Sequence, residues 1–233
     1  MSINIKTTIL HCKSLKDRKQ NMLQQMCKHH FSDYCFYEDF DGNELTNETI
    51  TQHCKRKAND WSYVKTKLEI YQNLHPQVMT TQRELTNGEI SLAIKHGKIY
   101  KELSRINAEY FIIFEDDVIL CENFETHFND YLSRTPSDWD VIYFGRGCNL
   151  HPQNITKENI AYKMNHPASR CSDSMLLKKS AVEDLAKTWF PFHLAADWEL
   201  GYQHFFHNHN IYWWEPSMVV QGSVCGLYGS SLR

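Results

Sequence analysis

The sequence predicts an α/β fold in which helices flank a mostly parallel central sheet. The segment YFIIFEDDVIL, residues 110–120, begins with five aromatic or β-branched residues, which is typical of a strand buried on both faces inside a parallel sheet. Helical and strand patterns alternate along most of the chain. The length of 233 residues allows one large core or at most two small ones. We therefore expect a single domain over residues 1–233.

The N-terminal part of the chain carries a β-α-β pattern. Residues 3–10 mix β-branched and polar side chains, as in a strand, and residues 13–28 place apolar side chains at helical spacing. A second short strand is expected over residues 34–40, closed by a turn at residues 41–43. The stretch that follows carries weaker signals and is expected to be rich in loops, with at most a helix around residues 63–73.

The middle of the chain contains the strongest helix signal. Thr86 is a suitable N-cap and Glu89 stands three residues later, so the pair predicts a capping box and a helix that continues to Leu103. The buried strand at residues 110–114 follows. The elements expected after it are a helix at 124–134, a strand at 139–144, helices at 180–187 and 197–206, and a strand at 211–214.

Three consecutive carboxylates, Glu115, Asp116 and Asp117, follow the strand at residues 110–114. In open α/β sheets, ligands bind outside the carboxyl ends of the strands. Adjacent carboxylates repel one another there unless a divalent cation neutralises them, and oxygen ligands favour Mg²⁺ or Mn²⁺ over Zn²⁺. Such ions keep open positions for phosphate oxygens. The triplet therefore predicts a metal site shared with a diphosphate, and the alternative is an acidic loop that merely ends a strand.

Composition excludes several classes of protein. A formal net charge of -3, from 25 basic and 28 acidic residues, argues against nucleic-acid binding by bulk electrostatics. No apolar stretch approaches the roughly 20 residues that span a bilayer, so no integral membrane contact is expected. The N-terminal apolar stretch is too short for a secretory signal, which favours a cytoplasmic location. The eight cysteines form no C-x-x-C pair and predict neither a structural zinc site nor a redox motif.

The segment HFFHNHN carries three histidines close together, His204, His207 and His209. At spacings of i, i+3 and i+5 the three imidazoles do not converge on one face of a helix. A zinc site would need a loop geometry that the sequence does not announce, so none is expected.

Several motifs together resemble glycosyltransferase family 25, which includes bacterial lipooligosaccharide galactosyltransferases and animal collagen galactosyltransferases. Two blocks in the correct order, EDDV at residues 115–118 and WDVIYFG at residues 139–145, are the specific signal. The block LTNGEISLAIKH, residues 85–96, resembles a family helix but has Lys95 where serine is usual.

Weaker matches extend the resemblance over nearly the whole chain. The first strand followed by Asp17-Arg18 resembles the family's first block, and Asp41-Gly42 resembles its aspartate-glycine turn. Ala196-Asp197-Trp198 resembles the start of a late helix, although Ala195 stands where the family has proline, and residues 216–223 resemble its closing block.

The resemblance implies a nucleotide-sugar-binding domain of the GT-A type, with a donor- and metal-binding half at residues 1–145 and an acceptor-side half at 146–233. It implies transfer of galactose or glucose from a UDP-sugar to a hydroxyl group, with Mn²⁺ or Mg²⁺ as cofactor. The acceptor is then hydroxylysine or galactosyl-hydroxylysine of a collagen-like protein, or a glycan. Two other functions stay open: a catalytically silent sugar-binding protein of the same fold, and a metal-dependent phosphohydrolase.

The candidate metal ligands and catalytic residues come from the acidic triplet and from the C-terminal third. Asp117 and Asp116 are expected to hold the cation, with Gln221 as a weak further ligand. Asp197 is the candidate general base, because inversion at the anomeric carbon needs a carboxylate to deprotonate the incoming hydroxyl. Its alternative role is an ordinary helix N-cap. Glu115 is expected to orient the pair or to contact the sugar or ribose.

The candidate donor-binding residues are expected around the diphosphate and the base. Arg18 is placed to reach the diphosphate, and the backbone amides of residues 10–12 are expected against the uracil. Glu89 and His96 stand seven residues apart on one helix face that is expected to line the donor pocket. The full set is Leu10, His11, Arg18, Glu89, His96 and Asp116.

Overall fold

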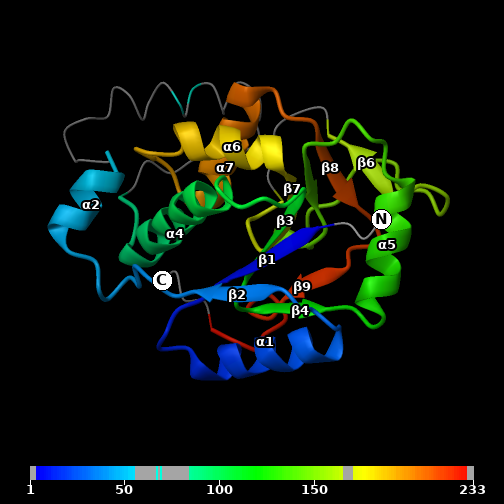
Figure 1. Cartoon of the computed structure of the whole chain (residues 1–233), viewed down its shortest axis with the longest axis horizontal. Coiled ribbons are helices and arrows are strands. Elements are labelled where there is room, and N and C mark those ends of the chain that lie inside the picture. The colour runs from blue at the N-terminus through cyan, green and yellow to red at the C-terminus, as the bar shows by residue number, and fades with distance from the viewer. Residues whose placement is uncertain (1–3, 56–66, 68, 70–83, 165–169, 230–233) are drawn as a thin grey trace.

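A computed structural model gives the fold and describes residues 4–55, 67, 69, 84–164 and 170–229. Its centre is a seven-stranded sheet with strand order β2-β1-β3-β7-β5-β8-β6 (Figure 1). The strands are β1 (Ile5–Leu10), β2 (Tyr34–Tyr37), β3 (Tyr110–Glu115), β5 (Val141–Tyr143), β6 (Ala161–Lys163), β7 (Ser174–Lys178) and β8 (Ile211–Trp214).

Most of these strands run in the same direction. β1 is parallel to both β2 and β3, and β5 is parallel to β8. β7 is antiparallel to its neighbours β3 and β5, and β6 is antiparallel to β8. All strands of the sheet except β6 and β7 therefore point the same way, and the predicted α/β fold with a mostly parallel sheet is confirmed.

Helices cover both faces of the sheet (Figure 1). Helices α4, α6 and α7 share one hydrophobic cluster with the sheet, and α1 and α5 share the other. Within β3, Phe111 and Ile113 belong to the first cluster, whereas Ile112 and Phe114 belong to the second. The helices are α1 (Lys16–Lys28), α2 (Asn47–His53), α4 (Asn87–Leu103), α5 (Phe124–Arg134), α6 (Lys179–Thr188) and α7 (Ala196–His207). Because alternate residues of β3 pack into the two clusters, β3 is confirmed as the predicted strand buried on both faces.

Strand β4 (Val118–Leu120) pairs with β9 (Val219–Gln221) in a separate two-stranded ribbon. These two strands, like β6, β7 and α2, were not predicted from the sequence; β4, β6 and β9 have only three residues each. β7 leads directly into α6 without an intervening turn, so no turn residues announce its end. The helix expected around residues 63–73 falls largely outside the described residues.

Over the described part of the chain, no helix combines the length and the apolar character that crossing a membrane requires. The single domain over residues 1–233 and the cytoplasmic location stay predictions.

Candidate functional site

The acidic triplet lies where the carboxyl ends of β1 and β3 meet. Leu10 at the end of β1 is in register with Glu115 at the end of β3, so the loop after β1 and the triplet share one edge of the sheet. In the β4-β9 ribbon, Val118 is paired with Gln221, which brings Gln221 beside Asp117. The amide of Gly222 also donates to the carbonyl of Asp117 over 2.6 Å. The β4-β9 ribbon therefore brings Gln221 and Gly222 next to Asp117, one of the predicted metal ligands.

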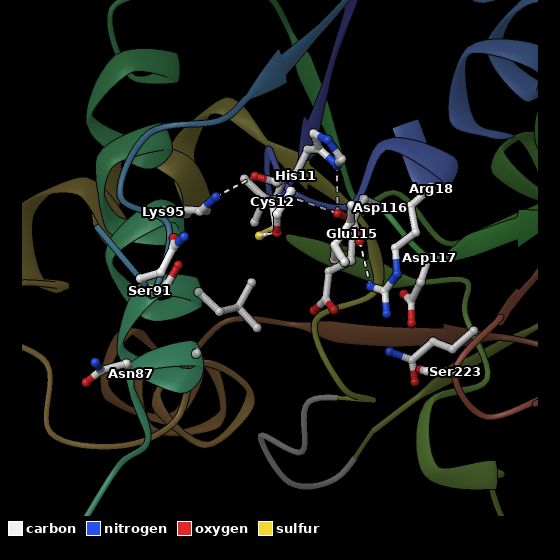
Figure 2. Close-up of a pocket in the computed structure, with 18 residues that line it drawn as sticks. His11, Cys12, Arg18, Asn87, Ser91, Lys95, Glu115, Asp116, Asp117 and Ser223 are labelled. Atoms are coloured by element: carbon white, nitrogen blue, oxygen red, sulfur yellow. Dashed lines mark hydrogen bonds and ion pairs between the residues drawn. The ribbon is translucent and has the colours of Figure 1, made fainter. Parts of the chain in front are cut away.

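An open cavity of about 440 Å³ lies between α4 and the acidic triplet. Figure 2 shows Asn87, Ser91 and Lys95 of α4 on one side and the triplet on the other. The volume falls in the range of sites that bind small molecules. Of the residues predicted for the site, the cavity is lined by Leu10, His11, Arg18, Glu115, Asp116, Asp117 and Gln221. The structure therefore gathers most of the predicted site around one cavity.

Asp116 is buried and neutralised by the protein itself. Its Oδ1 accepts from Arg18 Nη1 over 2.8 Å, and its Oδ2 lies 2.7 Å from His11 Nδ1 and accepts from the amide of Cys12 over 3.1 Å. Burial opposes ionisation of Asp116, but the hydrogen bonds from His11 and Arg18 outweigh it and hold its pKa below the usual range. Asp116 thus fixes the loop after β1, and a cation would have to compete with Arg18 for its oxygens.

The amides at the end of β1 are used within the protein. The amide of His11 donates to the carbonyl of Tyr37 over 3.0 Å, and the amide of Cys12 donates to Asp116. The expectation that these two amides face a uracil is therefore wrong. The physical reason is that the chain after β1 makes one more hydrogen bond to the end of β2 and then a hydrogen bond to the Asp116 carboxylate.

Asp117 and a fourth carboxylate, Asp173, each bury an oxygen that has no partner. Oδ1 of Asp117 and Oδ1 of Asp173 make no hydrogen bond within the described part of the chain. Asp173 lies just before β7, and its carbonyl accepts from the amide of Glu115 over 2.9 Å. No local pattern predicts a role for Asp173, because it stands far from the triplet along the chain and outside any recognised motif.

Burial and the charge of Asp117 raise the pKa values of Glu115 and Asp173. Burial, together with the charge of Asp117, raises the pKa of Glu115 well above its usual range, although Ser172 Oγ donates to Glu115 over 2.6 Å. Burial and the same charge raise the pKa of Asp173 to about 7. Buried, mutually repelling oxygens of this kind suit a hard divalent cation. Asp117, Glu115 and Gln221 line the cavity, where a cation would meet them, and Asp173 lies outside that lining.

Gly145, at the end of the WDVIYFG block, makes room for Asp173. A Cβ atom at this position would stand 2.1 Å from Asp173 Oδ2 and 2.3 Å from Ser174 Oγ. No side chain fits there without moving the carboxylate. The glycine of the block therefore allows the fourth carboxylate to pack behind the triplet.

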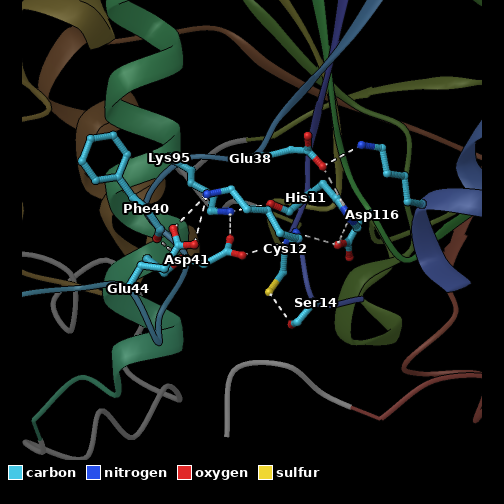
Figure 3. Close-up of polar contacts among 12 residues, drawn as sticks. His11, Cys12, Ser14, Glu38, Phe40, Asp41, Glu44, Lys95 and Asp116 are labelled. Carbon is cyan, nitrogen blue, oxygen red and sulfur yellow. Dashed lines mark hydrogen bonds and ion pairs between the residues drawn. The ribbon is translucent and has the colours of Figure 1, made fainter. Parts of the chain in front are cut away.

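Lys95 ties α4 to the loop after β1 (Figure 3). Its buried ammonium group donates to Asp41 Oδ1 over 2.6 Å and to the carbonyl of His11. Asp41 Oδ2 in turn accepts from the amide of Lys13 over 2.8 Å. Burial opposes the charge on Asp41, but Lys95 holds its pKa below the usual range. The sequence marked Lys95 only as a departure from the family pattern, and the structure makes it part of the cavity wall.

The face of α4 that lines the cavity is not the one predicted. His96 is fully buried in the core, with Nδ1 3.0 Å from the hydroxyl of Tyr100 and its ring 5.9 Å from that of Trp189. Burial lowers its pKa to about 3. Lys95 takes the cavity position because one step along a helix turns the side chain by about 100°. The expectation that His96 lines the donor pocket is therefore not met by this cavity.

Glu89 and Asp197 lie outside the cavity lining as well. Glu89 completes the predicted capping box, accepting from the amide of Thr86 over 2.9 Å while its own amide donates to Thr86 Oγ1 over 3.3 Å. Asp197 stands in the first turn of α7, whose N-cap is Ala195, so the alternative role as N-cap is wrong. Burial raises the pKa of Asp197, and the charge of Glu89 adds to the shift.

A model of glycosyltransferase family 25 (LPS biosynthesis protein) matches residues 4–173. The chain is 37% identical over 68 residues to procollagen galactosyltransferase 1-A of Xenopus laevis and 35% identical over 71 residues to inactive glycosyltransferase 25 family member 3 of Homo sapiens. Each match covers 28% of this chain and 11% of the relative, so the similarity spans only a small part of these longer proteins.

Solved glycosyltransferases show a weaker likeness. S. aureus TarS in complex with UDP-GlcNAc has a TM-score of 0.48 at 13% identity, covering 94% of this chain and 58% of that one. A glycosyltransferase involved in glycosylation of the major capsid of PBCV-1 has a TM-score of 0.44 at 11% identity, covering 98% and 94%.

Proposed function

Because the chain belongs to glycosyltransferase family 25, we propose that it is a metal-dependent enzyme that moves galactose or glucose from a UDP-sugar to a hydroxyl acceptor. The observation that carries the proposal is the cavity at the carboxyl ends of β1 and β3, which Asp117 lines and where its buried Oδ1 has no partner among the described residues. Such a cluster calls for a cation, and a cation next to an open cavity suits a diphosphate. The mostly parallel sheet flanked by helices agrees with this assignment.

Transfer breaks the bond between the anomeric carbon and the diphosphate, which leaves a nucleoside diphosphate with a new negative charge. A bound Mn²⁺ or Mg²⁺ supplies Lewis-acid stabilisation of that charge. We assign Asp117, Glu115, Asp173 and Gln221 to holding the cation, and Asp116 to positioning, because Arg18 and His11 already pair with it. Arg18 lines the cavity, and its guanidinium, which donates to Asp116 and to the carbonyl of Gly229, is assigned to the same phosphates.

Asp197 remains the proposed base for an inverting reaction. Burial raises the pKa of Asp197, and the charge of Glu89 adds to that shift, which favours proton uptake by this carboxylate. If the enzyme retains configuration, Asp197 binds sugar hydroxyls instead. Asp197→Asn is expected to lower the transfer rate by about 100-fold or more while leaving UDP affinity unchanged. Equal losses of affinity and rate would assign Asp197 to donor binding.

The acceptor is proposed to be hydroxylysine or galactosyl-hydroxylysine of a collagen-like polypeptide, or a glycan. The match to a procollagen galactosyltransferase favours the polypeptide, although it covers a small part of each protein. Relatives named as inactive also match, so a silent sugar-binding protein is the competing function.

Incubation with UDP-galactose, UDP-glucose and p-nitrophenyl phosphate, each with Mn²⁺ and without acceptor, tests the proposal. A transferase releases UDP slowly from one of the two sugars and leaves the phosphomonoester intact. A silent binding protein releases nothing, and a phosphohydrolase prefers the phosphomonoester. Repeating the incubation with collagen-like peptides and with glycans then identifies the acceptor by the increase in UDP release.

A further inference from the structure

The end of α7 folds back on itself and gathers its histidines. Asn208 adopts a left-handed conformation, with φ 55 and ψ 41, and the amide of His209 donates to the carbonyl of His204 over 3.0 Å. The rings of His207 and His209 consequently stack, with centroids 5.4 Å apart and planes at 17°. From the sequence, these histidines were compared only at helical spacing, where their rings do not meet on one face. The left-handed residue supplies the loop geometry that the prediction lacked.

The carboxylate of Asp184, on the neighbouring helix α6, lies close to His209. His209 Nε2 lies 3.6 Å from Oδ2 of Asp184 on α6. One donor atom each from Asp184, His207 and His209 lies within 4.8 Å of the others. In a tetrahedral zinc site, ligand atoms are about 3.4 Å apart, as follows from bond lengths of roughly 2.0–2.1 Å. The three groups therefore need only a small movement to enclose one ion.

His209 carries a ring nitrogen that is buried and unused. Its side chain is only 5% exposed, and Nε2 has no hydrogen-bond partner in the part of the chain that the structure describes. Its other nitrogen, Nδ1, lies 3.1 Å from Nδ1 of His204, whose Nε2 is 2.8 Å from the hydroxyl of Tyr143. This chain of contacts fixes the ring with Nε2 turned toward Asp184. Metal-binding histidines are commonly oriented by such a bond to the second nitrogen.

Hydrogen bonds and ion pairs also position His207 and Asp184, and both side chains are accessible to solvent. His207 Nε2 lies 2.7 Å from the hydroxyl of Thr188, one turn after Asp184 on α6. Lys187 pairs with Oδ1 of Asp184 over 3.1 Å, which leaves Oδ2 toward His209. Asp184 and His207 are half-buried, so an ion can enter from solvent and keep a water molecule as its fourth ligand.

We propose that Asp184, His207 and His209 bind one transition-metal ion of the zinc class, which ties α6 to the end of α7. Two imidazoles and one carboxylate favour Zn²⁺, Co²⁺ or Ni²⁺ over the Mg²⁺ and Mn²⁺ that an all-oxygen site selects. None of the three residues lines the cavity beside the acidic triplet, so this site is separate from the proposed donor site and stands independently of the transfer chemistry.

Titration with Co²⁺, followed by its visible absorption, tests the proposal on the metal-free full chain. We expect one equivalent of Co²⁺ to bind with the absorption of a tetrahedral site, and Zn²⁺ to displace it. The spectrum should lack a thiolate charge-transfer band, which distinguishes this site from one with cysteine ligands. His209→Gln and Asp184→Asn should each weaken binding by about 100-fold or more. Zn²⁺ should raise the melting temperature of the native chain and not that of either variant.

The controls are chosen to separate the two metal sites. His127→Gln changes an exposed histidine on α5, and Asp117→Asn changes the other cluster, so both should keep the Co²⁺ spectrum. Asp184→Asn alters a half-exposed side chain and keeps the test valid should His209→Gln unfold the protein. No Co²⁺ absorption in the native chain, or equal affinity in native chain, His209→Gln and Asp184→Asn, overturns the proposal.

Discussion

At the scale of single residues, two buried ion pairs shape the loop after β1. Arg18 pairs with Asp116 and Lys95 pairs with Asp41, and all four side chains are at most 8% exposed. Removing one partner of such a pair leaves an uncompensated buried charge, which costs far more than the net contribution of the pair. Two buried ion pairs therefore hold the loop that borders the cavity, and removing either partner of a pair is expected to destabilise the protein.

Lys95→Met is expected to lower the free energy of unfolding by about 3 kcal/mol, because Asp41 is left buried without its cationic partner. Lys13→Met is the matched control, since it breaks the exposed pair with Glu44 near the same loop. The control is expected to leave stability nearly unchanged. Urea unfolding followed by circular dichroism measures both. Equal stabilities of the two variants would show that the Lys95 pair is not formed in solution.

Asp173→Asn tests the fourth carboxylate. The change keeps the shape of the side chain but removes the charge, so Mn²⁺ affinity is expected to fall by about 10-fold or more. Asp130→Asn, on the exposed side of α5, should leave the affinity unchanged. Isothermal titration with Mn²⁺ gives both values. An unchanged affinity in Asp173→Asn would remove this residue from the cation site.

At the scale of elements, α4 shows what periodicity can and cannot predict. The capping box fixed its start, and the apolar residues at helical spacing predicted its length. The cavity-facing side was harder to choose, because α4 has a broad buried face that includes both Lys95 and His96. From the sequence, His96 was predicted to line the donor pocket, and Lys95 was noted only as a departure from the family pattern. Which one faces the core depends on Trp189 and Tyr100, and no local pattern reports those contacts.

The burial of His96 between α4 and α6 predicts a dependence of stability on acid. The unfolded state takes up a proton near the ordinary histidine pKa, whereas the folded state resists protonation down to about 3. Stability from this site is therefore complete near neutral pH and is lost as the pH falls, by about 2 kcal/mol between about pH 7 and pH 5. His96→Gln should lose less stability over the same interval. Identical pH profiles of unfolding free energy would contradict the assigned environment.

At the scale of the whole molecule, the sheet order decides which distant segments meet at the cavity. The sequence correctly predicted the buried strand β3 and its acidic end, because hydrophobic pattern and charge are local signals. Asp173 and the β4-β9 ribbon depend on long-range pairing, and short strands without flanking turns do not reveal that pairing. Gln221 was placed beside the metal only through the resemblance to a family. The stacking of His207 and His209 was not predicted, because one left-handed residue, Asn208, redirects the chain.

The central claim is that Asp117 and its neighbours hold a divalent cation that binds the diphosphate of a nucleotide sugar. Calorimetric titration of UDP into the native chain, with and without Mn²⁺, tests it most directly, alongside Asp117→Asn and the exposed control Asp130→Asn. We expect UDP binding that requires Mn²⁺ in the native chain and in Asp130→Asn, and a loss of about 100-fold or more in Asp117→Asn. UDP binding that is independent of Mn²⁺, or unchanged in Asp117→Asn, would contradict the account.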